Sequence, residues 1–399
     1  METTLSSSTD GLSRSKRLVI TFGYYAAFIG LGLTTASLGP TLQNLADNTH
    51  STLSQVSYLF TARSLGYLIG SLLGGRLYDR IKGHRVAGIV LLIMALTLAL
   101  APFIPILWLL IFDLLILGIG EGALDVGGNT LLVWLHREKV GPFMNGLHFF
   151  FGIGAFLSPV IIAQAVLQLD TFAWGYGILA LLLLIPAAWL PPLPSPISKA
   201  QSEGRAPDKI NYLLVGLLAV FFFLYVGAES SYGGWVFTYA TALKLADTAN
   251  AAYLTSAFWG ALTVGRLLAI PLTARFRAGT ILLADLLGCA VSLLVILLFP
   301  ASLPAVWIGT LGVGLSMASV FPTMISLAGT WMATTGQITS FFFVGASFGG
   351  MFLPWVIGQL FEPVGPQVTV IAIFINIVLD VAVLAVLRQM VARSHSKGH

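Results

Sequence analysis

The sequence has little of what a soluble protein needs. Cys289 is the only cysteine in 399 residues, so no disulfide can form within the chain. Charged residues make up only 9% of the chain, against about 25% in an ordinary soluble domain. So few charges cannot cover the surface of a water-soluble protein of this length. A typical soluble protein is therefore excluded.

Several catalytic signatures are missing as well. The chain has no Gly-x-x-x-x-Gly-Lys loop, which would hold the phosphates of a nucleotide. No cluster of His and Cys has the spacing of a metal site. The most polar interior stretch is 191–210, which is too short to hold a soluble catalytic domain. We expect no enzyme, no organic cofactor and no ATP hydrolysis.

What the chain does have is long apolar runs. Apolar residues make up 57% of it, and its mean hydropathy is +0.91. About 20 apolar residues suffice for a helix to cross the hydrocarbon core of a bilayer. The candidate spans lie at 17–43, 52–77, 86–106, 107–134, 142–166, 172–190, 211–241, 252–273, 279–299, 303–327, 337–360 and 366–390.

Positive charge follows an alternating pattern between these runs. All of the 20 Lys and Arg except Arg63, Lys244 and Arg266 lie at the termini or in every second gap. Because Lys and Arg accumulate on the cytoplasmic side, both termini are expected inside a multi-pass protein of the cell (inner) membrane. The sequence pI near 9.2 then reflects basic loops beside anionic membrane lipid and requires no nucleic-acid partner. We expect a monomer.

Two similar halves are indicated by a polar linker and by weak repeats. The sequence Leu-Gly-Ile-Gly at 117–120 recurs as Leu-Gly-Val-Gly at 311–314, and Gly70 has a counterpart in Gly265. An even number of spans in each half makes the two copies a parallel repeat. The expected fold is an all-α membrane protein of twelve transmembrane helices in two six-helix bundles. The expected parts are an N-terminal tail at 1–16, bundles at 17–190 and 211–390, a linker at 191–210, and a C-terminal tail at 391–399.

A motif after the second span makes a family resemblance specific. Gly75, Asp79 and Arg80, followed by Gly83 and Arg85, resemble the loop motif of the major facilitator superfamily, with one extra residue before the second glycine. Glycine allows close helix contact, and the charges can pair at the membrane face. The resemblance implies a gating or structural role for Gly75, Asp79 and Arg80.

Further stretches resemble one subgroup of that superfamily. Segments 124–129, 145–152 and 226–229 are similar to the fucose-permease-like sugar–cation symporters and their sodium-dependent glucose transporter relatives. This resemblance implies secondary active transport of a small polar solute, a monosaccharide, by alternating access. The coupling ion would be H⁺ or Na⁺.

Carboxylates inside the spans require an explanation, because each costs about 2.5–3.5 kcal/mol near the bilayer centre. Glu121, Asp125 and Asn129 follow one another at helical spacing and form one stripe on the fourth span. The resemblance favours Asp125 as the cation or proton site. A buried ion pair with Arg63 is the structural alternative. With Na⁺, Asp125 and Asn129 would be the ligands; a lone desolvated carboxyl suits H⁺.

The seventh span carries a second candidate, Glu229. The glycines at 233–234 are expected to loosen this helix, and broken helices form substrate sites in transporters. Carboxylates, amides and flat aromatic faces together suit a sugar, although each aromatic residue has a packing alternative. The candidate substrate contacts are Asn129, Asn145, His148, Tyr232, Trp235, Tyr239 and Trp259.

Two intramembrane arginines complete the candidates. Arg63 is expected to pair with an acid of the fourth span, as a gate or a structural pair, with a substrate contact as the alternative. Arg266 is expected to pair near the end of the eighth span. A proton-coupled exporter of drugs or amphiphiles with the same fold is the alternative function. A membrane receptor is a third, and it would normally need a signalling domain.

Overall fold

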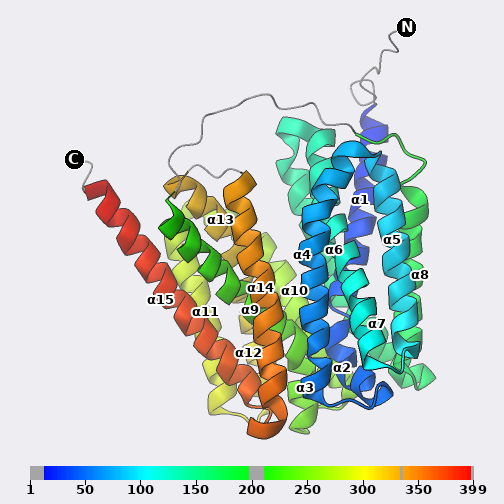
Figure 1. Cartoon of the computed structure of the whole chain (residues 1–399). Coiled ribbons are helices and arrows are strands. Elements are labelled where there is room, and N and C mark those ends of the chain that lie inside the picture. Colours follow the sequence, from blue (N-terminus) through cyan, green and yellow to red (C-terminus); the bar gives the residue numbers. More distant parts are fainter. Residues whose placement is uncertain (1–12, 197–210, 333–335, 397–399) are drawn as a thin grey trace. The chain divides into compact units, whose positions relative to one another are not determined.

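The computed structural model describes residues 13–196, 211–332 and 336–396, and these form helices without strands (Figure 1). The helices in chain order are α1 (Arg14–Thr35), α2 (Leu38–Asn48), α3 (Leu53–Val56), α4 (Tyr58–Arg80), α5 (Gly83–Leu100), η1 (Ala101–Phe103), α6 (Leu107–His136), η2 (Arg137–Lys139), α7 (Gly141–Leu169), α8 (Phe172–Trp189), α9 (Tyr212–Ala242), α10 (Thr248–Arg275), α11 (Ala278–Leu298), α12 (Leu303–Met317), α13 (Val320–Trp331), α14 (Gly336–Val364) and α15 (Val368–Ser396).

Eleven segments of the described chain are long and apolar enough to cross a membrane. Helix α4 is not among them, because Arg63 and the charges at its end lower its hydropathy. Its 23 residues nevertheless rise about 34 Å, enough for the hydrocarbon core. The all-α membrane fold expected from the sequence is confirmed, with α4 as the least apolar of its long helices.

Contacts divide the chain into two compact units, and each is described by itself. The first holds α1, most of α4 and α5 to α8; the second holds α9 to α15. Gly39–Asp47 and Ser51–Ser64 also belong to the second unit. There the Ser54 hydroxyl donates to the Gln359 side chain over 2.7 Å. This division differs from the predicted bundles in those two short segments. The predicted tail 1–16 and linker 191–210 lie largely outside the described residues.

In the first unit, glycines bring three pairs of helices together. Helix α1 packs on α7, α5 packs on α8, and α4 lies against α6. At the α1–α7 contact, Gly154 lies so close to the Ile29 carbonyl that a Cβ atom would overlap it. Small residues are what let membrane helices approach this closely.

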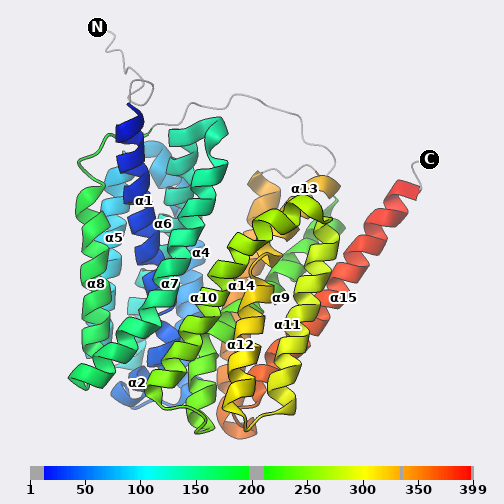
Figure 2. The ribbon, with the colours of Figure 1, turned by 180° about the vertical axis from the view of Figure 1, so that it is seen from behind.

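The second unit repeats the arrangement with its own residues. Helix α9 packs on α14, α11 on α15, and α10 on α12 (Figure 2). At the α9–α14 contact, Gly349 lies against the Phe223 carbonyl as Gly154 lies against Ile29. The two units thus share one packing scheme, in agreement with the repeat in the sequence.

The breaks within the spans do not lie where the sequence predicts them. Helix α9 runs without interruption through Gly233 and Gly234, so the expected loosening of this span is wrong. These glycines make room for neighbours instead: a Cβ atom on Gly234 would lie 2.6 Å from the Phe60 ring. The breaks fall between α1 and α2, and between α12 and α13, where Ser319 precedes α13.

Two helix ends also differ from the predicted boundaries. Helix α1 begins at Arg14, inside the expected tail, and α15 continues to Ser396, beyond the expected end of the last span at 390. Both extensions carry polar and basic residues. Helical backbone bonds are satisfied internally, so such a helix can continue past the apolar region.

Candidate transport site

The best-defined polar cluster of the first unit surrounds Asp125 of α6. One carboxylate oxygen accepts a hydrogen bond from the Tyr67 hydroxyl of α4, and the other accepts from the Asn129 amide over 2.9 Å. The Asn129 amide also donates to the Asp125 backbone carbonyl over 2.8 Å. Asp125 and Asn129 therefore lie together as their helical spacing predicts, each half-buried.

Close helix packing holds Tyr67 in place beside α6. Gly66 and Gly70 lie against the backbone of α6, and Gly122 lies against the Tyr67 carbonyl. Sequence reasoning missed Tyr67. The signal that would have found it is the spacing of small residues along α4, which marks the face turned to another helix.

Glu121 lies one turn before Asp125 on the same stripe and is 3% exposed. The stripe inferred from the sequence thus faces protein. Its role in coupling stays a prediction.

Glu229 lies in the second unit, half-buried in α9. One turn earlier, the buried Tyr225 donates its hydroxyl proton to the Met317 carbonyl over 2.8 Å, at the end of α12. Glu229 therefore lies on a face that meets the broken pair α12–α13. Its convergence with Asp125 stays a prediction, because the two acids belong to different units.

The aromatic residues of α9 are packed core side chains. Trp235 is 0% exposed, its indole N–H donates to the Pro354 carbonyl over 3.1 Å, and its ring stacks on Phe361. The Tyr232 hydroxyl is bonded to Thr310 of α12 over 2.8 Å. Tyr239 is buried too. This placement supports the packing alternative for all three and gives no support to the substrate contacts expected from the sequence.

The remaining substrate candidates are scattered. Asn145 is exposed near the start of α7, far from the middle of that helix, so its placement does not support a midplane contact. The half-buried His148 ring meets the edge of Phe28, which packs on Gly128 beside Asn129. His148 therefore adjoins the Asp125 cluster through one aromatic ring.

Trp259 of α10 is buried and lies edge to face with Phe258. Like the aromatic residues of α9, it takes part in the packing of the second unit. Its substrate role stays a prediction.

The loop motif is placed at the end of α4, where one detail corrects the expectation. A Cβ atom placed on Gly75 would have no atom of another helix within 4 Å, so Gly75 is not the close-contact glycine. Gly74 has that role, packed against Ala123 of α6. Arg80 is exposed, and the Asp79 side chain lies outside the described residues.

The residue after the motif's second glycine makes a network that the sequence did not reveal. His84 is 1% exposed; one ring nitrogen is bonded to the Tyr24 hydroxyl over 2.7 Å and the other to the Leu193 carbonyl over 3.0 Å. The start of the inter-bundle segment is thereby tied to α1 and α5. A buried ring with both nitrogens bonded has a structural role here.

The roles predicted for the two intramembrane arginines stay predictions. Arg63 is half-buried in α4, in the second unit, so its expected pairing with the acids of α6 stays a prediction. Arg266 is half-buried in α10 directly after Gly265, which packs on Ala318 and Leu315. Both gating roles therefore remain open to experiment.

A metal site of the usual kind is not formed by the residues that the structure describes. Among them, no group of three or more His, Cys, Asp or Glu side chains could hold a metal ion. A site for Na⁺ would have to combine the Asp125 carboxylate with amide, hydroxyl or backbone oxygens, the ligands that hard cations accept.

Comparison with known proteins fits this architecture. The profile of the Major Facilitator Superfamily matches residues 24–354. The chain belongs to this superfamily. It is thus a multi-pass membrane transporter of a small-molecule solute rather than an enzyme, as the sequence led us to expect.

Relatives and solved structures refine the comparison. Sodium-dependent glucose transporter 1A of Mus musculus is 34% identical over 84% of this chain and 88% of its own length. A point mutant of the nucleoside transporter NupG superposes with a TM-score of 0.77 over 93% of this chain and 99% of its own, at 14% identity. A D-xylose–proton symporter superposes with a TM-score of 0.76 over 92% and 97%, at 15% identity. These likenesses confirm the fold.

Proposed function

We propose that this superfamily member is a sugar–cation symporter that carries a monosaccharide together with Na⁺. The observation that carries the proposal is the Asp125 carboxylate, held inside a membrane-spanning helix by Tyr67 and Asn129. The sodium-dependent glucose transporters that are 34% identical to it over 84% of its length support both the solute class and the ion.

Charge compensation is the physical basis of the coupling. A carboxylate in a membrane interior is costly, and hydrogen bonds donated to it lower that cost. A cation bound at Asp125 would neutralise the charge and favour the state in which the site is closed with sugar bound. A ligand shifts such an equilibrium only through its different affinity for the two states.

The chemistry of the Asp125 cluster favours Na⁺ as the coupled ion. The two Asp125 carboxylate oxygens accept hydrogen bonds from the Tyr67 hydroxyl and the Asn129 amide, so the carboxylate lies among neutral oxygen and amide groups. The Asn129 amide can turn to offer its oxygen, since the two ends of an amide are similar in shape. Carboxylate and amide oxygens suit Na⁺. H⁺ remains the second candidate and is tested alongside it.

The experiment is uptake of labelled D-glucose into proteoliposomes. We expect accumulation above the equilibrium level under an inward Na⁺ gradient, and none under an equal K⁺ gradient. Asp125→Asn should abolish accumulation while glucose exchange at equilibrium persists, because the neutral amide keeps sugar binding but cannot bind the ion. Asp113→Asn is the matched control: it makes the same change in the same helix at a buried site outside the cluster.

Each outcome is informative. Full Na⁺-driven uptake by Asp125→Asn would remove Asp125 from the coupling site. Accumulation driven only by a pH gradient would make H⁺ the ion. If no sugar is carried and expression instead confers drug resistance, the exporter alternative would be correct.

For the membrane setting, we infer a cell membrane with both termini in the cytoplasm. The support is the accumulation of Lys and Arg at the termini and in every second gap between spans. Labelling of single cysteines placed near residue 13 and near residue 396 in intact cells tests it: neither should react with an impermeant reagent.

A further inference from the structure

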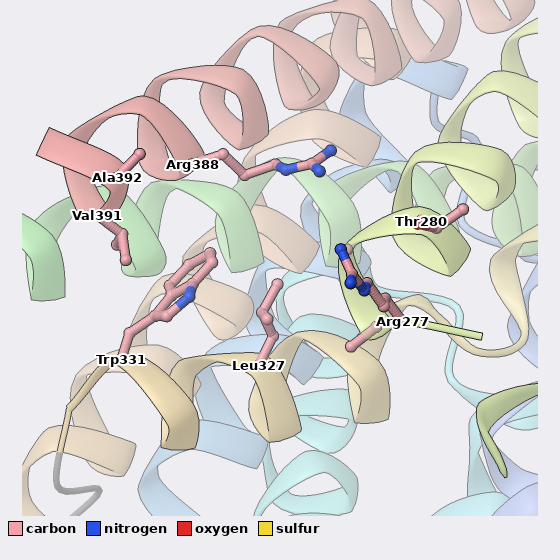
Figure 3. Close-up of a pocket in the computed structure, with 9 residues that line it drawn as sticks. Arg277, Thr280, Leu327, Trp331, Arg388, Val391 and Ala392 are labelled. Atoms are coloured by element: carbon pink, nitrogen blue, oxygen red, sulfur yellow. The ribbon is translucent and has the colours of Figure 1, made fainter. Parts of the chain in front are cut away.

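A cavity of about 380 Å³ lies in the second unit, at the end of the helices where α10 joins α11 and where α15 finishes (Figure 3). It has the size of a small-ligand pocket. None of the transport candidates takes part in it. Its lining residues are Arg277, Ala278, Gly279, Thr280, Leu327, Trp331, Arg388, Val391 and Ala392.

Two arginine side chains make this cavity positively charged. Arg277 precedes the first turn of α11, Arg388 lies in the last turns of α15, and both guanidinium groups point into the same space (Figure 3). Among the described residues, neither guanidinium group has a hydrogen bond or an ion pair. Segments 248–284, 303–361 and 381–399, which supply the pocket wall and its surroundings, contain no Asp or Glu. No acidic residue of these segments can therefore neutralise the two guanidinium groups.

The start of α11 adds positive potential of the same sign. No side chain caps this helix, and the first N–H to find a backbone acceptor is that of Thr280, bonded to the Arg277 carbonyl. The Arg388 guanidinium carbon lies 3.6 Å from the place that a Cβ atom on Gly279 would occupy. A cation beside a helix N-terminus is unfavourable unless an anion lies between them.

The remaining wall is apolar and aromatic. Leu327 and Trp331 of α13 face Val391 of α15 across the cavity. Phe276, next to Arg277, is 56% exposed. Trp beside basic residues at the end of apolar helices is typical of the level of the lipid headgroups.

From this cavity and its converging arginines, we propose that the pocket binds a phosphate-bearing anion, with the headgroup of an anionic phospholipid as the source that the apolar wall favours. The two guanidinium groups bind the phosphate oxygens. Free N–H groups of the first turn of α11 and the Thr280 hydroxyl are further donors. The lipid chains then lie against Leu327, Trp331 and Val391. This site is independent of the sugar site proposed above.

The test is native mass spectrometry of the purified full chain, titrated separately with phosphatidylglycerol, with phosphatidylcholine of the same acyl chains, and with inorganic phosphate. We expect phosphatidylglycerol to bind about tenfold more tightly than phosphatidylcholine. Arg277→Gln combined with Arg388→Gln should remove that preference. Arg275→Gln, an exposed neighbour outside the pocket, is the matched control and should keep it.

A second variant tests the site independently, in case the double variant does not fold. Ala392→Glu adds a carboxylate to the pocket lining, so the arginines gain an internal partner and the preference for phosphatidylglycerol should disappear with both arginines intact. Arginine-dependent binding of inorganic phosphate at similar affinity would make a free anion the source and supports the site. Binding of both probes that is unchanged in the double variant and in Ala392→Glu overturns the proposal, as does equal loss in Arg275→Gln.

Discussion

Asp380 of α15 offers the sharpest test of the packing in the second unit. Its side chain is 0% exposed, and neither carboxylate oxygen has a hydrogen-bond partner among the residues that the structure describes. Leucine has the same branching as aspartate and no polar atoms. We therefore expect Asp380→Leu to raise the free energy of unfolding, whereas most core substitutions lower it.

The size of the effect follows from the unpaired polar atoms. Burial of a polar group without a partner costs about 1–3 kcal/mol in protein mutational data, and more if the group is charged. Leucine removes this cost. Its slightly larger volume must fit into a packed core, however, and this reduces the stabilisation. A net stabilisation of about 1–2 kcal/mol is expected.

The assay is denaturant unfolding in mixed micelles, with Asp285→Leu as the matched control. Asp285 lies in α11, which packs on α15, and accepts a hydrogen bond from Ser319. Its replacement leaves the Ser319 hydroxyl unpaired and should cost about 1–3 kcal/mol. The two substitutions must then change stability in opposite directions. A loss of stability in Asp380→Leu would refute the reasoning, since it would mean that the carboxyl group has a partner.

Three further predictions concern single contacts. Tyr67→Phe removes a donor from Asp125, so the cation should bind about tenfold more tightly, read as a lower half-saturating concentration in uptake assays. Gly70→Val places a side chain against the α6 backbone and should cost about 2–4 kcal/mol, visible as loss of the monodisperse peak in size-exclusion chromatography. Trp235→Phe should lower the free energy of unfolding by about 1–2 kcal/mol and leave sugar affinity unchanged; a tenfold loss of affinity would restore its role as a ligand.

Much of the fold could be read from the sequence because the bilayer imposes strong constraints. Apolar length and the distribution of Lys and Arg identify the spans without any knowledge of packing. The stripe of Asp125 and Asn129 was predictable for a similar reason, since helical spacing alone places residues four apart on one face. Their hydrogen bond confirms that placement.

Contacts between helices could not be read in the same way. The contact of Tyr67 with Asp125 depends on how α4 packs against α6, which the sequence does not show. Likewise, the motif favours Gly75 as the contact glycine, whereas Gly74 has that role. A glycine pair in the sequence does not reveal whether it breaks a helix or makes room for a neighbour. At 233–234 it makes room, because the ring of Phe60 fills the space.

The repeat, taken together with the packing, shows that the two halves differ at the position of the proposed coupling residue Asp125. At the spacing that relates Leu117 to Leu311, Asp125 corresponds to Ser319. The first unit thus has a carboxylate in a continuous helix, whereas the second has a hydroxyl at a helix break, bonded to Asp285. A duplicated scaffold needs only one half to carry the charge that a cation neutralises, since the other half can respond through its shape. If that is correct, Ser319→Ala should leave the cation dependence of uptake unchanged, and Asp125→Asn should abolish it.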